Sequence, residues 1–172
     1  SNVGGNANTL VEAEMDVVKT DVGVSVKRWM PDCEPPPTYR ACVDLPERID
    51  RWQEFELHAP AGVLQWNGGV SVGQGAREDH SKREGGFSLR LYHFATPVTE
   101  TSCYYFWSAA NGHNVEDPNA TDSMVEQLKV ALEEDKEIVT AQQARLSEVG
   151  EDWLVNIRSD RARVLMRRFI KD

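Results

Sequence analysis

Cysteine is scarce in this sequence, which has only three in 172 residues: Cys33, Cys42 and Cys103. They are widely spaced and odd in number, so they form neither the CxxC spacing of a zinc site nor a paired disulfide framework. Thiols that have no partner are typical of a reducing compartment, and we therefore expect a cytoplasmic protein.

Positive charge and long apolar runs are also lacking. The chain carries 19 Lys and Arg against 28 Asp and Glu, which gives a net charge of -9. An acidic chain gains nothing from approaching phosphates, so nucleic acid is not an expected partner. No segment approaches the roughly 20 apolar residues of a transmembrane helix, so a membrane is not expected either. With 40% hydrophobic and 27% charged residues, the composition is that of one globular domain.

Several catalytic signatures are missing as well. The glycine cluster at residues 68–75 is not followed by Lys-Ser/Thr, which excludes a phosphate-binding loop, and no GxSxG motif occurs. The four histidines, His58, His80, His93 and His113, form no HxxxH or HxxxxH pair. Their spacing therefore predicts no self-contained histidine metal site.

Alternating side chains predict a sheet in the first two-thirds of the chain. The segments at residues 22–30, 51–58, 63–72, 87–96 and 101–110 combine this alternation with β-branched or aromatic residues. Trp52 is out of phase in its segment, and Asn67-Gly68-Gly69 predicts a turn or bulge in the next. We expect the polar stretch at residues 73–86 to be a mobile hairpin loop. Short connections between the segments favour antiparallel pairing.

The last third of the chain predicts helices. Asp117-Pro118 provides an N-cap with Pro at the first helical position, and Gly150 provides a stop, which predicts one long helix over residues 118–149. A second helix is expected at residues 160–170. Strands followed by one long helix predict an α+β domain whose curved sheet wraps that helix.

Asp135 is out of place in the long helix. On a helical wheel Met124, Leu128 and Leu146 form an apolar stripe, and Asp135 falls about 20° from Met124, at the centre of the stripe. A carboxylate in an apolar layer needs compensation, since its burial otherwise costs several kcal/mol or protonates it. Two interpretations remain open: a buried salt bridge or hydrogen bond, and a metal ligand or catalytic acid.

His93 is the histidine with the most informative position. It shares the phase of Phe87, Leu89 and Leu91, so it is either a hydrogen-bonded core residue or a polar group that projects into a ligand cavity. The aromatic run at residues 104–107 is most simply core, with a pocket wall as the alternative.

Longer motifs resemble a known family. TETSCYYFW at residues 99–107, Asp117-Pro118 and EDKEIVTAQQ at residues 134–143 are similar to the C-terminal part of Rieske non-haem iron oxygenases. The vanillate O-demethylase and dicamba monooxygenase-like branch has the greatest similarity, which extends to residues 28–31, 43–52 and 161–170.

The resemblance implies a fold and two site residues. The fold is a helix-grip (START/Bet v 1-like) α+β domain, in which a curved antiparallel sheet surrounds a long C-terminal helix. In this family a mononuclear Fe(II) is held by two His and one Asp, which leaves positions open for O2. Asp135 matches the metal-binding carboxylate, and His93 matches a position that contacts substrate. No residue is assigned a further catalytic role.

The chain also departs from the family pattern. It contains neither the C-x-H nor the C-x-x-H of a Rieske cluster, and the two iron-binding histidines are missing. Residues 1–6 look like the loop that follows the second of these histidines. We therefore expect residues 1–172 to be the C-terminal part of the oxygenase catalytic domain, without the Rieske domain. By itself such a chain is expected neither to hold catalytic iron tightly nor to turn over.

The function implied by the resemblance is O2-dependent hydroxylation or O-demethylation of an aromatic or similarly apolar small molecule. Electrons would pass from NAD(P)H through a ferredoxin or reductase to a 2Fe-2S cluster and then to the iron. The intact protein would be a homotrimer. The alternative is a metal-free helix-grip module that binds an apolar small molecule between sheet and helix.

Overall fold

The structure is a computed structural model that describes residues 5–150 and 155–171. Six strands form one sheet: β1 (Glu14–Lys19), β2 (Gly23–Cys33), β3 (Ile49–His58), β4 (Gly62–Ser71), β5 (Phe87–Thr99) and β6 (Ser102–Asn111). The helices are α1 (Ala7–Glu12), α2 (Pro37–Cys42), α3 (Pro118–Val149) and α4 (Arg161–Lys171), with 3-10 turns η1 (His80–Arg83) and η3 (Arg158–Asp160). Of the helices within these described ranges, not one has the length and apolarity needed to cross a membrane.

The sheet is an antiparallel meander. Its spatial order is β1-β2-β3-β4-β5-β6, so every strand pairs with the next one in the sequence. The five predicted strands and the α+β class are confirmed. The predicted bounds of the long helix also hold, because Asp117 caps it by accepting a hydrogen bond from the Asn119 backbone N–H, and Gly150 ends it at φ 79°.

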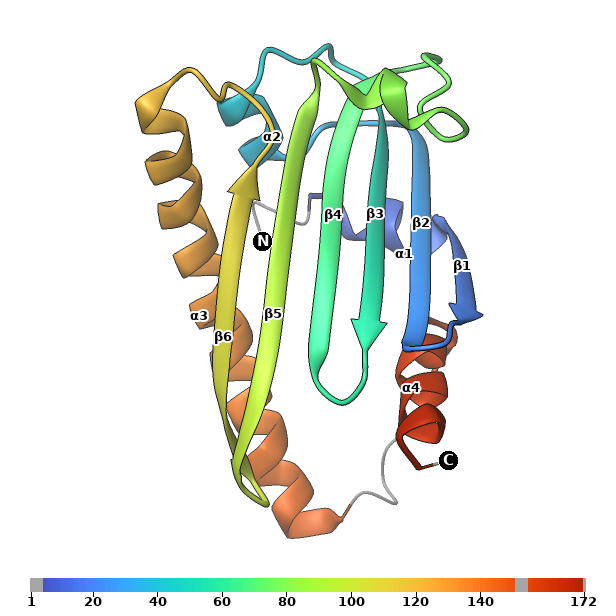
Figure 1. Cartoon of the computed structure of the whole chain (residues 1–172), viewed down its shortest axis with the longest axis vertical. Helices are drawn as coiled ribbons and strands as arrows, with labels where there is room; N and C mark the ends of the chain where they lie inside the picture. The colour runs from blue at the N-terminus through green and yellow to red at the C-terminus, as the bar shows by residue number, and fades with distance from the viewer. Residues whose placement is uncertain (1–4, 151–154, 172) are drawn as a thin grey trace.

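The two faces of the sheet are covered differently. In the view of Figure 1, α1, α4 and the later turns of α3 lie behind the sheet, and we call this side the helical face. Residues 73–86 fold over the opposite side at one end, and we call it the loop face. Because side chains alternate along each strand, the register assigns every strand residue to one of these faces.

The helical face carries the main apolar core. Its largest cluster joins residues of β2, β3 and β5 to Met124 and Leu128 of α3, and all of them are buried. A second cluster joins Val17, Val24 and Val26 to Met166 of α4, at the other end of the sheet. The two C-terminal helices therefore cover opposite ends of one face, and the strand surface between them carries polar residues.

The loop face has a compact tryptophan cluster. Trp52 is fully buried there, stacked on Trp29 and edge-on to Trp66. Arg83 lies over the rings of Trp52 and Trp66, at 4.4 Å from each centroid, and forms an ion pair with Glu54 at 2.8 Å. This packing explains why Trp52 is out of phase with the core. It also ties residues 73–86 onto the sheet, which the prediction of a free hairpin loop did not anticipate.

The turn or bulge predicted at residues 67–69, within the segment 63–72, is wrong. β4 continues in register through Asn67, Gly68 and Gly69. A Cβ on Gly68 would lie 2.0 Å from the Trp52 ring, and one on Gly69 would lie 2.6 Å from Ile49. These glycines are present because bulky neighbours approach the backbone closely, not because the chain turns there.

Candidate functional site

Asp135 lies on α3 in the predicted phase but not in the predicted environment. The stripe that contains it is buried at Met124 and Leu128, whereas Asp135 itself is exposed. Ile138 and Val139, further along the same helix, are 67% and 61% exposed. The expectation of a carboxylate inside an apolar layer is therefore wrong for the described structure.

His93 lies on β5 and projects from the helical face. Its Nδ1 forms a short hydrogen bond with the Tyr105 hydroxyl, and its Nε2 lies 3.2 Å from Gln65 Oε1. Gln65 accepts, so Nε2 carries the proton, and Nδ1 accepts the hydrogen of the Tyr105 hydroxyl. The Tyr105 ring stacks on the imidazole with 5.8 Å between centroids. Half-buried His93 is thus a neutral imidazole that is held at both nitrogens.

Asp135 acts electrostatically on this His93–Tyr105 pair. Burial lowers the pKa of His93, and the negative charge of Asp135 opposes that effect in part. Burial raises the pKa of the Tyr105 hydroxyl, and Asp135 raises it further. Asp135 is therefore close enough to both strand residues to act on them through its charge, although these elements are about 40 positions apart in the sequence.

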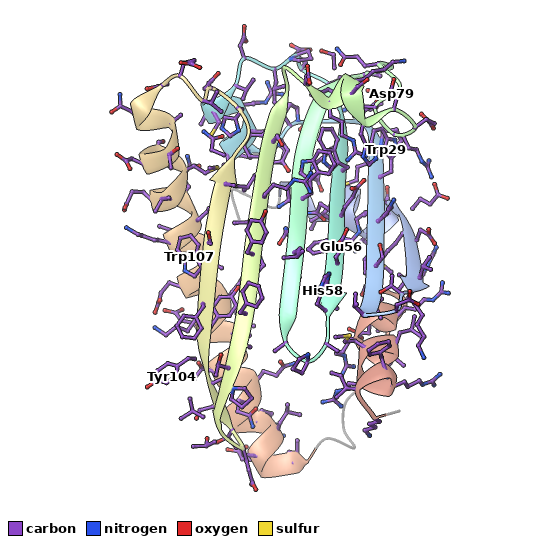
Figure 2. All side chains as sticks on the ribbon, viewed as in Figure 1. Trp29, Glu56, His58, Asp79, Tyr104 and Trp107 are labelled. Carbon is purple, nitrogen blue, oxygen red and sulfur yellow. The ribbon has the colours of Figure 1, made fainter. Side chains whose placement is uncertain are left out.

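The other three histidines lie elsewhere. His58 and Glu56 stand on the loop face, where both are labelled in Figure 2. His80 is exposed and packs edge-on against Trp66. His113 is buried beside Phe87, and its Nδ1 donates to the Ser88 carbonyl at 3.0 Å. None of these three joins Asp135 and His93.

The donor set at this site fits one ligand position of an iron centre. Asp135 offers an exposed carboxylate on a rigid helix, which suits a divalent cation. His93 is not a second ligand in this arrangement, since both ring nitrogens already have partners. Within residues 5–150 and 155–171 no group of three His, Cys, Asp or Glu side chains is close enough to hold a metal ion. Further imidazole ligands would have to come from outside the described part of the chain.

Sequence reasoning missed Tyr105 and Gln65 as partners of His93. Both lie on the helical face, and Gln65 belongs to the strand next to β5. The period-2 pattern placed all three on strands, but their proximity depends on the register between strands. The aromatic run also divides between faces. Trp107 packs against the core near α3 (Figure 2), whereas Tyr104 and Phe106 point to the loop face and are 65% and 57% exposed.

The arrangement of sheet and helices has close counterparts among solved structures. Dicamba monooxygenase bound to 3,6-dichlorosalicylic acid matches with a TM-score of 0.78 and 21% identity, over 95% of this chain and 47% of that one. Dicamba monooxygenase with non-haem iron and dicamba matches with a TM-score of 0.73 and 20% identity, over 99% of this chain and 50% of that one. The chain therefore has the predicted α+β helix-grip fold, with a curved antiparallel sheet and a long C-terminal helix.

The family follows from the sequence comparison. The family model described as the vanillate O-demethylase oxygenase C-terminal domain matches residues 1–172, and the chain belongs to this family. The predicted resemblance is thereby confirmed, and it is supported over a metal-free binding module.

Curated relatives carry names of oxygenase components. A vanillate O-demethylase oxygenase subunit of Pseudomonas sp. (strain ATCC 19151) is 30% identical, over 84% of this chain and 45% of its own length. The toluene-4-sulfonate monooxygenase iron-sulfur subunit of Comamonas testosteroni is 26% identical, over 86% and 44%. The oxygenase component of a chloroacetanilide N-alkylformylase from Rhizorhabdus wittichii is 28% identical, over 96% and 47%. The chain spans less than half the length of these relatives.

Proposed function

We propose that residues 1–172 form the C-terminal part of the catalytic domain of a Rieske-type monooxygenase or O-demethylase. The observation that carries this proposal is the approach of Asp135, on α3, to the His93–Tyr105 pair on the sheet. A metal-binding carboxylate and a substrate-orienting polar pair would then face the same space. The family match over the whole chain supports the same assignment.

Asp135 would hold the iron together with two histidines from another part of the intact protein. A mononuclear Fe(II) bound in this way supplies the activation of O2. Because Asp135 is fixed on a long helix and His93 on a central strand, the relative position of metal and substrate would be set by the docking of α3 on the sheet.

His93 would orient the substrate. Burial favours its neutral form, and the Gln65 and Tyr105 contacts fix its ring plane. A substrate oxygen that replaced Gln65 at Nε2 would accept a hydrogen bond at a defined point beside Asp135. Trp107 and the exposed apolar residues of α3 would supply the walls for an aromatic or similarly apolar molecule.

The remaining parts belong to the intact protein. We propose that a 2Fe-2S cluster in a separate Rieske domain delivers electrons taken from NAD(P)H by a ferredoxin or reductase. We also propose a homotrimer in the cytoplasm, where Cys33, Cys42 and Cys103 stay reduced. The multi-component systems named for the relatives support an external electron donor.

Replacement of Asp135 by Asn in the intact protein tests the metal assignment. Because Asn loses the anionic oxygen, we expect stoichiometric mononuclear iron and O2-dependent turnover to be lost, with the 2Fe-2S spectrum unchanged. Glu134→Gln is the matched control, since it removes one exposed charge from the neighbouring position on α3. Iron content and activity equal to wild type in Asp135→Asn would reject the assignment.

A further inference from the structure

A row of polar side chains crosses the helical face between α3 and α4. The register aligns Arg28 of β2 with Gln53 of β3, Gln53 with Asn67 of β4, and Asn67 with Leu89 of β5. Leu89 is aligned in turn with Asn111 of β6. Four of the five positions in this transverse row are therefore polar, although the rows on either side of it contribute to the apolar core.

Three buried atoms of this row have no hydrogen-bond partner among the described residues: Arg28 Nε, Asn67 Oδ1 and Asn111 Nδ2. The described part of the chain has seven such side-chain atoms in all, and three of the seven belong to this row. Two others, Trp52 Nε1 and Arg83 Nη1, lie in the ring stack on the loop face. Buried polar groups without partners are rare in native proteins, so these atoms mark a row in which a polar ligand could form hydrogen bonds.

Arg28 is the charged member of the row. Its Nη1 donates to Gln53 Oε1 at 3.4 Å and its Nη2 approaches Met15 Sδ at 3.5 Å, so both contacts are neutral. Within residues 5–150 and 155–171 no carboxylate forms an ion pair with it. Burial lowers the pKa of its guanidinium, and the like charge of Arg51 lowers it further. A half-buried guanidinium without a counter-ion is costly, and an incoming anion would remove that cost.

We propose that Arg28 is an anion-recognising residue on the helical face and that it binds a carboxylate or sulfonate on the substrate. This inference rests on the proposed function, because it assigns the anion to the molecule that is oxidised beside Asp135. A guanidinium matches both anions through two parallel N–H bonds. Gln53 keeps its amide N–H groups for a further bond, since only its Oε1 is used by Arg28.

The position of Arg28 also limits the length of the substrate. Arg28 and His93 lie on one face but three strands and two rows apart. Strand spacing and residue rise put their Cα atoms roughly 20 Å apart, and the two side chains span part of that distance. An acid that reaches from Arg28 to the reacting end beside Asp135 is therefore longer than one aromatic ring.

Binding to the intact protein tests the proposal without turnover. Biphenyl-4-carboxylate and its neutral amide, biphenyl-4-carboxamide, are titrated calorimetrically, with benzoate as the short acid. Charged hydrogen bonds of this kind are worth a factor of roughly 10 or more in affinity. We expect the long acid to bind at least tenfold more tightly than its amide and than benzoate. In Arg28→Gln the preference for acid over amide should fall to about twofold or less.

The controls separate the possible outcomes. Lys27→Gln removes the same charge from the adjacent position, on the loop face, and should keep the acid preference. Arg28→Lys keeps the positive charge but not the planar pair of guanidinium donors, so part of the preference for acid over amide should remain. This variant also shows whether a loss of that preference in Arg28→Gln is due to a folding defect. A wild-type protein without acid preference would overturn the proposal. So would an unchanged preference in Arg28→Gln together with a lower melting temperature, because Arg28 would then pair with a protein carboxylate.

Iron content measured in the same preparations distinguishes this proposal from the proposed function. Loss of acid preference with mononuclear iron retained supports Arg28 as the anion partner. Unchanged acid preference with iron retained rejects Arg28 and leaves the oxygenase assignment intact.

Discussion

Two arginines on opposite faces of the sheet are surrounded very differently. Arg83 on the loop face has Glu54 as counter-ion, the Ala76 carbonyl as acceptor at 2.9 Å, and two tryptophan rings. Arg28 on the helical face has an amide oxygen and a thioether. Arg83 therefore has its counter-ion within the chain, although its buried Nη1 has no hydrogen-bond partner among the described residues. Arg28 has no counter-ion among the described residues, and it is the one that shares a face with Asp135 and His93.

The largest expected effect is at Arg83. Arg83→Met removes the partner of Glu54, which is only 17% exposed, and leaves its charge uncompensated. We expect the free energy of unfolding to fall by about 3–5 kcal/mol, as for other broken buried ion pairs. Urea unfolding measures this change.

Arg77→Met is the control for Arg83→Met. The ion pair of Arg77 with Glu14 is exposed at both ends, and its loss should cost less than about 1 kcal/mol. Equal effects of the two substitutions would show that the buried Arg83–Glu54 pair contributes no more to stability than an exposed one.

An intermediate effect on the free energy of unfolding is expected when the pH is lowered, because of His113, which is buried on the helical side of the sheet. Nδ1 donates to the Ser88 carbonyl, and Nε2 is buried without a partner among the described residues, so a second proton would have no acceptor there. Burial therefore lowers the pKa of His113 in the folded state, against a smaller opposing effect of the Ser88 bond. Its stabilising contribution is present above the unfolded pKa of about 6.5 and is lost as the pH falls below it, with a slope of at most about 1.4 kcal/mol per pH unit.

The comparison between wild type and His113→Gln isolates this residue. The variant should lose less stability than wild type between pH 7.5 and pH 5.5, as measured by thermal or urea unfolding. The same pH dependence in both proteins would contradict the assignment of His113 as a neutral buried imidazole.

The smallest effect, and one of opposite sign, is expected at Arg28. Arg28→Met keeps the apolar part of the side chain and removes a charge that has no counter-ion among the described residues. We therefore expect stability without ligand to stay equal or to rise by up to about 1 kcal/mol. Urea unfolding of Arg28→Met beside Arg83→Met gives the contrast directly. A loss of several kcal/mol at Arg28 would make the two arginines equivalent.

Much of the fold was accessible from the sequence because the signals were local. The cap at Asp117, the stop at Gly150 and the period-2 pattern of the strands depend only on neighbouring residues. Helices α1 and α2 were missed because six residues are too few to show a helical period, and α2 begins within a proline-rich stretch that resembles a turn. β1 was missed because Val17 and Val18 are adjacent and break the alternation.

The site was only partly accessible, for a different reason. The helical wheel gave the direction of Asp135 but not what covers that side of α3, and the residue proved exposed. The partners of His93 required the register. Arg28 did leave a signal, since it shares the phase of Val24, Val26 and Met30 and is thus a charge on the apolar side of a strand. The reasoning that singled out Asp135 applies to it equally.

The strict chain order of the sheet has an evolutionary consequence. Every pairing joins strands that follow one another in the sequence, so the lengths of the connections and the register shifts within the strands decide which side chains form the grid on the helical face. Inserting one residue within a strand would send every later side chain of that strand to the other face. Substitution within the grid leaves the scaffold untouched. A lineage that keeps these connections can therefore exchange single residues at positions such as 28, 53, 65 and 93 and change the chemistry of the helical face on the same scaffold.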